Sequence, residues 1–263
     1  MRVFLKTISL FLFITASNSA HSQSKDTLSF CYTTWLPYTV LSKDNELSGI
    51  SIELIRKAAQ NLDIEVAFIK LPWKRCLHDV RLGKLDAVVD AGARDDLLQG
   101  PTALAYYSNA IWVHQVDALK DLSDLTALSG RVAGYIDGYT YAEPYWKIPD
   151  LTIDYSPNEA TVLKKLAARR VDFIIADYIN TKHVLKKQLL PIRALKPFPS
   201  VDPLFLSFNR DRKAAHLRFE AEFRSLRTSG FVDQVYLKHT GTSLKDITQM
   251  FAKTVLDDLE QGF

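Results

Sequence analysis

The chain has 263 residues, of which 47% are apolar and 24% are charged, and its formal net charge is +3. This composition is ordinary for a globular protein and excludes the disordered and collagen-like classes. Arg2 and Lys6 are two of the 33 basic residues, so the rest of the chain holds 31 basic residues against 30 acidic ones. A balanced surface gives no electrostatic reason to expect a nucleic-acid partner.

Residues 1–22 are typical of a secretory signal peptide. Arg2 and Lys6 flank a short apolar run that ends at Ile14, and small or polar residues follow it up to Ser22. The alternative is a membrane anchor, but the run is shorter than the roughly 20 residues that a membrane span needs. We therefore expect cleavage near Ser22 and an exported protein in the periplasm.

Cys31 and Cys76 are the only cysteines of the chain. Two cysteines in an oxidising compartment can form a disulfide, and the alternative is two unpaired buried thiols. Two cysteines alone cannot make a structural zinc site, and the histidines show no metal-ligand pairing. We expect neither a metal nor a cofactor.

The first part of the mature chain predicts a parallel α/β unit. Apolar periodicity indicates helices at 50–62 and 73–82, and strands at 27–34, 64–69 and 86–90. The order strand, helix, strand, helix, strand is typical of a parallel, doubly wound sheet.

The same order starts again at Gly130, with strands at 130–135, 151–155 and 171–176 and helices at 158–169 and about 178–187. This repetition predicts two α/β lobes. We expect the chain to cross between them in the polar stretch 114–122 and in the proline-rich stretch 196–203. Residues 23–116 and 202–263 then form lobe 1, and residues 117–201 form lobe 2.

Ligands of open α/β sheets bind outside the carboxyl ends of the strands. Aromatic, polar and glycine residues gather at those ends here, as in a binding cleft. The segments concerned are Thr33, Thr34 and Trp35 with Tyr38, then 71–73, 90–93, 136–140 and 176–177. The nucleophile-elbow and zinc-protease motifs are absent, so binding without chemistry is the leading interpretation.

The order of these segments resembles solute-binding protein family 3, the periplasmic amino-acid-binding type. In the first half, WLPY, LSGISIELIRKAAQNLDIEVAFI and LPWKRCLHDVRLGKLDAVVDAG carry the likeness. Within them, PWKRCL followed by LGKLDAVV resembles a divergent branch. In the second half it is carried by LSGRVAGYIDGYT, KKLAARRVDFIIAD and FRSLRTSGFVDQVYLKH.

The resemblance implies a hinged, two-lobed periplasmic-binding-protein fold of type II, without enzymatic activity. It also implies delivery of a small molecule to an ABC permease. We expect the protein to be a monomer. Each lobe would be a mostly parallel sheet flanked by helices, with two hinge crossovers.

The resemblance also assigns roles by position. Trp35 and Trp73 would be aromatic walls, and Thr33 or Thr34 would sit at the end of the first strand. Gly138, Tyr139 and Thr140 would hold the ligand from lobe 2, Ala91 would contribute backbone, and Asp177 would pair with a ligand ammonium group. Alternatively, Trp35, Trp73 and Tyr38 only pack in the core, and Asp177 caps the helix that follows it.

One departure from the family limits the prediction of the ligand. The family's carboxylate-binding arginine falls on Leu98, and a family threonine falls on Ala93. Arg94 or Arg75 could take over, although Arg75 could equally form a surface ion pair. We therefore predict a small polar organic solute, amino-acid-like or cationic.

Two other functions fit the same scaffold. One is a periplasmic dehydratase-like enzyme, in which Asp90 or Asp177 would act as acid or base. The other is an orphan sensor or partner-presenting protein.

Overall fold

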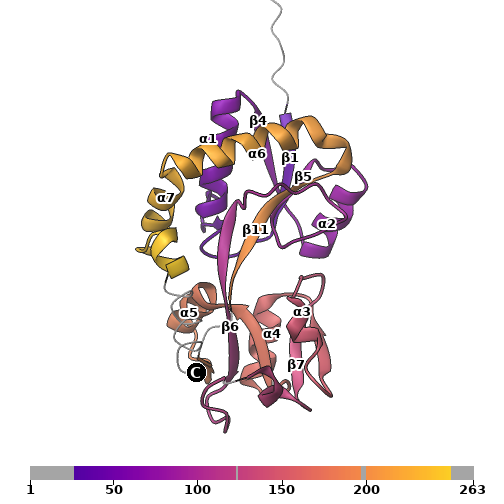
Figure 1. Ribbon diagram of the computed structural model, residues 1–263, viewed down its shortest axis with the longest axis vertical. Helices are drawn as coiled ribbons and strands as arrows, with labels where there is room; N and C mark the ends of the chain where they lie inside the picture. The colour runs from indigo at the N-terminus through magenta and orange to yellow at the C-terminus, as the bar shows by residue number, and fades with distance from the viewer. Residues whose placement is uncertain (1–26, 123, 197–199, 250–263) are drawn as a thin grey trace, which may run out of the picture.

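The computed structural model describes residues 27–122, 124–196 and 200–249, and the predicted signal peptide lies outside them. Two α/β lobes lie end to end and are joined by two long strands, β6 (Ala105–His114) and β11 (Ser200–Phe208) (Figure 1). One path of paired strands runs through both lobes in the order β4-β1-β5-β11-β6-β9-β7-β8.

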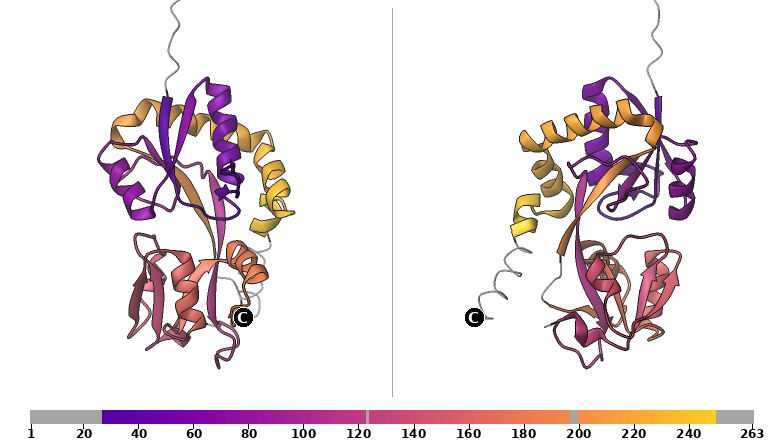
Figure 2. Two further views of the ribbon diagram at one scale, coloured as in Figure 1. Left: turned by 180° about the vertical axis from the view of Figure 1, so that it is seen from behind. Right: turned by 45° about the vertical axis from the view of Figure 1, so that its right-hand side comes forward.

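Lobe 1 holds the N-terminal and C-terminal parts of the described chain. Its strands are β1 (Thr27–Tyr32), β2 (Val40–Leu41), β3 (Leu47–Ser48), β4 (Glu65–Lys70) and β5 (Ala87–Ala91). Its helices are α1 (Ile50–Leu62), α2 (Trp73–Arg81), η2 (Arg210–Arg212), α6 (Lys213–Thr228) and α7 (Phe231–Thr240). Strand β1 pairs in parallel with β4 and β5, while β11 joins β5 antiparallel. Helix α1 packs against α6 and α7 (Figure 2).

Lobe 2 repeats this arrangement with the middle of the chain. Its strands are β7 (Val132–Ile136), β8 (Thr152–Ser156), β9 (Phe173–Asp177) and β10 (Ile192–Ala194). Its helices are η1 (Leu125–Leu128), α3 (Glu143–Trp146), α4 (Glu159–Ala167) and α5 (Tyr178–Lys187). Strand β7 pairs in parallel with β8 and β9, and β6 joins β9 antiparallel. Separate apolar clusters include Ile111 and Phe173 in one and Trp112 and Ile174 in the other, as expected for a sheet covered on both faces.

The predicted helices and strands of the two α/β units are present, with ends displaced by up to two residues. Helix α1 has the predicted bounds. It starts after Gly49, whose φ is 114°, a conformation that favours glycine. A side chain there would overlap the carbonyl group of Tyr38.

Strands β2 and β3, which pair only with each other, were not predicted, and neither were β6 and β10. The pairing of β6 moves the first crossover toward the N-terminus, because Tyr107 packs on the lobe 1 core and Ala110 packs within lobe 2. The crossing therefore lies inside β6, ahead of the stretch 114–122. The lobe boundaries at residues 117 and 202 stay predictions, and the packing favours a first boundary near residue 108.

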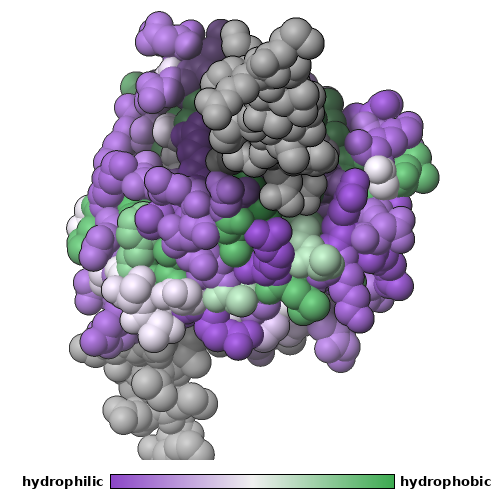
Figure 3. Space-filling view, turned by 90° about the horizontal axis from the view of Figure 1, so that it is seen from above, coloured by the Kyte–Doolittle hydropathy of each residue, from purple (hydrophilic) through white to green (hydrophobic). Residues whose placement is uncertain are grey.

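The end of lobe 1 is mostly hydrophilic where it is visible from above, and its hydrophobic residues lie in small separate groups (Figure 3). Within the described residues, no helix has the length and apolar character that crossing a membrane requires.

Candidate ligand-binding cleft

An inner cavity of about 30 Å³ lies where the two lobes meet. Lobe 1 and the crossing strands contribute Thr33, Trp35, Trp73, Val89, Asp90, Gly92, Arg94, Tyr107 and Leu204, and lobe 2 contributes Tyr139 and Thr140. A wider cleft of about 760 Å³ adjoins it and shares Thr33, Trp73 and Tyr139. The three shared residues form the wall between the cavity and the cleft.

Aromatic rings make up much of this wall. The ring of Tyr139 lies 6.1 Å from that of Trp35 and 5.8 Å from that of Trp73, between centroids. Tyr107 adds a ring 5.4 Å from Trp35. The inner cavity has room for about one water molecule. A solute that binds between the two tryptophans must therefore displace the Tyr139 ring, which moves away with lobe 2 if the lobes part.

Gly138 is the main point of contact across the cleft. Its carbonyl oxygen accepts hydrogen bonds from Trp73 Nε1 at 3.0 Å and from Arg94 Nη2 at 2.6 Å. Its φ is 81°, which a side chain would strain. The adjacent Asp137 forms an ion pair with Lys74. The predicted site residue Gly138 therefore holds the lobes together.

Asp90 lies at a β-bulge near the end of β5. Ala91 pairs with Phe205 and Val88 pairs with Ser207, so two residues of β5 lie opposite Leu206 alone. Asp90 itself has a φ of 59° and is 6% exposed. Its Oδ1 accepts a hydrogen bond from the Ser51 hydroxyl, and its buried Oδ2 has no partner among the described residues. Burial raises the pKa of Asp90 to about 7, against the Ser51 hydrogen bond.

Arg94 brings a guanidinium to the same cavity. Its Cζ lies 5.6 Å from the centroid of the Trp73 ring, as in a cation–π contact. Its buried Nε has no partner in the described chain, and burial lowers its pKa. Trp35 Nε1 is likewise buried and unpaired. The cavity is thus lined by three residues with an unsatisfied polar atom, two of them donors and one an acceptor.

Asp177 does not line the cavity or the wider cleft. It caps α5, because its Oδ1 accepts a hydrogen bond from the Asn180 amide at 2.5 Å. Its Oδ2 accepts from the Ser108 amide at 3.0 Å and from the Tyr38 hydroxyl at 3.2 Å. Burial raises the pKa of Asp177 to about 7. Both carboxylate oxygens are occupied by the protein, as the capping alternative anticipated.

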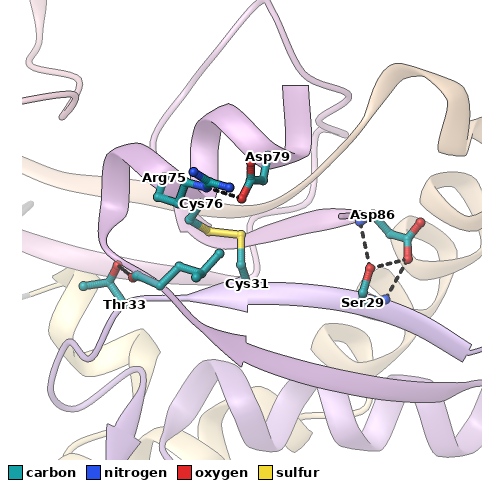
Figure 4. The surroundings of a disulfide bond; sticks show 8 residues. Ser29, Cys31, Thr33, Arg75, Cys76, Asp79 and Asp86 are labelled. Atoms are coloured by element: carbon teal, nitrogen blue, oxygen red, sulfur yellow. Dashed lines mark hydrogen bonds and ion pairs between the residues drawn. A yellow bond between two sulfur atoms is a disulfide. The ribbon is translucent and has the colours of Figure 1, made fainter. Parts of the chain in front are cut away.

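The other predicted site residues divide between the cleft and the protein interior. Thr34 lines only the wider cleft. Tyr38 is fully buried and packs 5.1 Å from Trp35, and Ala91 is buried within β5. Arg75 is exposed and pairs with Asp79 at 2.5 Å, so it forms the surface ion pair that was its alternative (Figure 4).

Sequence reasoning had not assigned five of the lining residues to the ligand site. Asp90 was named individually as an acid or base, while Val89, Gly92, Tyr107 and Leu204 were not singled out. Gly92 was inside a segment at a predicted strand end, and this was the available signal. Tyr107 and Leu204 come from β6 and β11, whose crossing paths the sequence does not reveal.

Cys31 and Cys76 form a disulfide that ties β1 to α2, with 5.7 Å between their Cα atoms (Figure 4). Each cysteine is three residues or fewer from a cavity residue, Thr33 and Trp73 respectively. The disulfide therefore joins the two segments that supply one wall of the site.

Comparison with solved structures identifies the class of fold. The substrate-binding protein of an amino acid ABC transporter matches with a TM-score of 0.70 and 15% identity, over 82% of this chain and 100% of that one. A histidine kinase sensor domain with similarity to periplasmic binding proteins matches with a TM-score of 0.72 and 16% identity, over 83% and 98%. The fold is the predicted type II periplasmic-binding-protein fold.

Comparison of sequences supports the predicted family. The model of the bacterial extracellular solute-binding proteins, family 3, matches residues 29–96. The probable amino-acid-binding protein YxeM of Bacillus subtilis (strain 168) is 26% identical over 204 residues, 72% of this chain and 75% of that one. These matches confirm the resemblance to family 3 and support a solute-binding protein.

Proposed function

We propose that this protein captures a small polar organic solute between its lobes and delivers it to an ABC importer. One observation carries the proposal: three cavity residues, Trp35, Asp90 and Arg94, each have a buried polar atom without a partner in the described chain. Buried polar groups are ordinarily satisfied, so we infer that a bound ligand supplies partners for these atoms. Two donors and one acceptor suit a solute that has both kinds of group.

The interlobe contacts support a mechanism of closure. A ligand shifts the equilibrium between open and closed forms only if it binds the closed form more tightly. A solute that enters between Trp35 and Trp73 and displaces the Tyr139 ring meets this condition, since it touches both tryptophans of lobe 1 and also contacts lobe 2. Closure also forms the two hydrogen bonds to the Gly138 carbonyl group. This function involves no chemical change of the solute.

The export part of the proposal rests on the family resemblance and on residues 1–22. We propose a periplasmic protein that acts as a monomer, with the ABC permease as its partner. N-terminal sequencing of the exported protein tests the cleavage site, and uptake of labelled ligand by a deletion strain tests the role in import. Uptake that is unchanged in the deletion strain contradicts that role.

Thermal unfolding in the presence of metabolites tests solute binding. The panel contains amino acids, polyamines, organic acids and quaternary amines. A ligand at 100 times its Kd adds about 2.7 kcal/mol of stability. Trp73→Ala should abolish that gain, whereas Trp146→Ala, a tryptophan of lobe 2 outside the cavity and the cleft, should preserve it. A folded protein that no compound stabilises contradicts solute binding.

A dehydratase-like enzyme is the second candidate, because Asp90 is a buried carboxyl in the cavity with a pKa raised to about 7. That value suits a general acid or base. Incubation with prephenate or arogenate, followed by chromatography, tests the candidate. Formation of a new product supports the enzyme, and recovery of a bound compound unchanged contradicts it.

A further inference from the structure

Asp90 is an acidic side chain without a charged partner in the described chain. Its Oδ1 is held by the Ser51 hydroxyl of α1, while Oδ2 is buried and unpaired in a residue that lines the inner cavity. Leaving a buried carboxylate without a cation is unfavourable by several kcal/mol. The fold maintains this arrangement, so the unpaired oxygen can accept a partner from outside the chain.

The backbone at Asp90 is specialised to place this carboxylate. The extra residue of β5 opposite Leu206 forms a β-bulge, and Asp90 adopts a left-handed φ of 59°. Bulges re-aim side chains and are frequent beside active sites. A non-glycine residue in this region is uncommon, and unusual backbone conformations cluster at functional sites. Both features point to a role beyond the packing of lobe 1.

The groups around Asp90 favour a positive charge. Trp35, Tyr107 and Tyr139 line the same cavity, and aromatic faces attract cations. Arg94 also lines the cavity, but its Nη2 donates to the Gly138 carbonyl oxygen and its guanidinium lies over the Trp73 ring. These contacts leave Asp90 without a charged partner in the described chain.

The charge of Asp90 affects the pKa of three tyrosines, but none of their phenol groups neutralises it. The negative charge of Asp90 contributes to the raised pKa of Tyr38, Tyr139 and Tyr236, after the larger effect of burial. These hydroxyls stay protonated at neutral pH. The carboxylate is therefore available to a cation that enters the cavity.

Asp177 provides the contrast. It is buried to a similar degree and its pKa is also raised to about 7, but its two oxygens accept from Asn180, Ser108 and Tyr38. It has no unpaired oxygen and does not line the cavity. The two aspartates can therefore be compared by the same substitution.

We propose that Asp90 binds a protonated nitrogen of the ligand, in the role that the family resemblance gives to Asp177. The ligand class is then organic compounds that carry an ammonium or amidinium group. This inference rests on the proposed solute-binding function. Since Asp90, Trp35 and Trp73 all belong to lobe 1, the charge of the ligand is recognised there before lobe 2 closes over it with Tyr139.

Matched compounds test the class of ligand. Putrescine, 4-aminobutyrate and succinate share a four-carbon chain and carry two, one and no ammonium groups, respectively. Calorimetry measures the binding of these three compounds and of every compound that stabilises the protein in the thermal panel. We expect every ligand found to contain a protonated nitrogen. Binding only of compounds without one, such as succinate, overturns the inference and leaves solute binding intact. If no compound of any class binds, solute binding itself is contradicted.

Matched substitutions test the residue. With the best ligand, Asp90→Asn should lower the affinity by about 10- to 150-fold, as expected for a lost hydrogen bond between charged groups. Asp177→Asn should change it less than threefold, because asparagine also caps helices. Asp90→Ala is the second variant, and every variant must show a cooperative melting transition. A loss of affinity in Asp177→Asn but not in Asp90→Asn or Asp90→Ala overturns the inference.

Discussion

Replacing Asp90 with asparagine should stabilise the unliganded protein, and more so at high pH. In the folded state, burial raises the pKa of Asp90 from 3.8 to about 7. Between these values the folded protein keeps a proton that the unfolded chain releases, so the free energy of unfolding falls as the pH rises from about 4 to about 7. Asparagine has no such titration, still accepts from Ser51, and tolerates a left-handed φ.

The magnitude follows from the difference in pKa. A difference of about three corresponds to about 4 kcal/mol, fully developed above pH 7 and about half developed at pH 5.5. The advantage of Asp90→Asn over the wild type should therefore grow by about 2 kcal/mol between pH 5.5 and pH 8. For a protein of this size, that is about 4–8 °C in Tm.

Thermal unfolding of both proteins at the two pH values measures this growth. Asp79→Asn is the control of opposite sign, because the hydrogen bond from Arg75 lowers the pKa of Asp79. That variant should be less stable than the wild type at pH 8, and the gap should narrow in acid. An advantage of Asp90→Asn that is the same at pH 5.5 and pH 8 would refute the claim that a buried, unpaired carboxylate titrates here.

Three further predictions concern the ligand and the fold. The affinity for an ammonium ligand should fall up to about tenfold per pH unit below about pH 7, because Asp90 takes up a proton there. Calorimetry across pH 5–8 measures this dependence, and a constant affinity contradicts the prediction. Gly92→Ala places a methyl group against Thr140 Oγ1 across the cleft, so this variant should bind the ligand about tenfold more weakly. Adding Thr140→Ala should restore the affinity, and equal affinities in the single and double variants argue against closure. Replacing Cys31 and Cys76 with serine releases a link between residues 45 apart and should cost about 4 kcal/mol in urea unfolding, so unchanged stability would contradict a disulfide.

Several elements could be predicted from local pattern because their own residues determine them. Helix α1 is periodic in apolar residues from Ile50 to Leu62, and the structure has the same bounds. Strand β6 was not predicted, because Ser108 and Asn109 interrupt its apolar residues. Those two positions are buried by β9 and β11, which lie more than 60 residues away in the chain.

The candidate site, too, could be predicted only in part from the sequence. Its position at the carboxyl ends of strands followed from the sequence, and Trp35, Trp73, Tyr139 and Thr140 do line the cavity. The sequence did not decide whether Asp177 contacts a ligand or caps a helix, since an aspartate before a helix suits both roles.

The sequence by itself determined the order of the α/β units, the apolar faces of the helices and the place where a ligand would bind, because these depend on residues close together in the chain. The tertiary structure decided which charges remain free there. Asp177 is satisfied in part by Tyr38, 139 residues away, and the bulge at Asp90 exists only because β11 returns to pair with β5. The satisfaction of a buried carboxylate is a property of the groups packed around it, and long-range pairing brings those groups together.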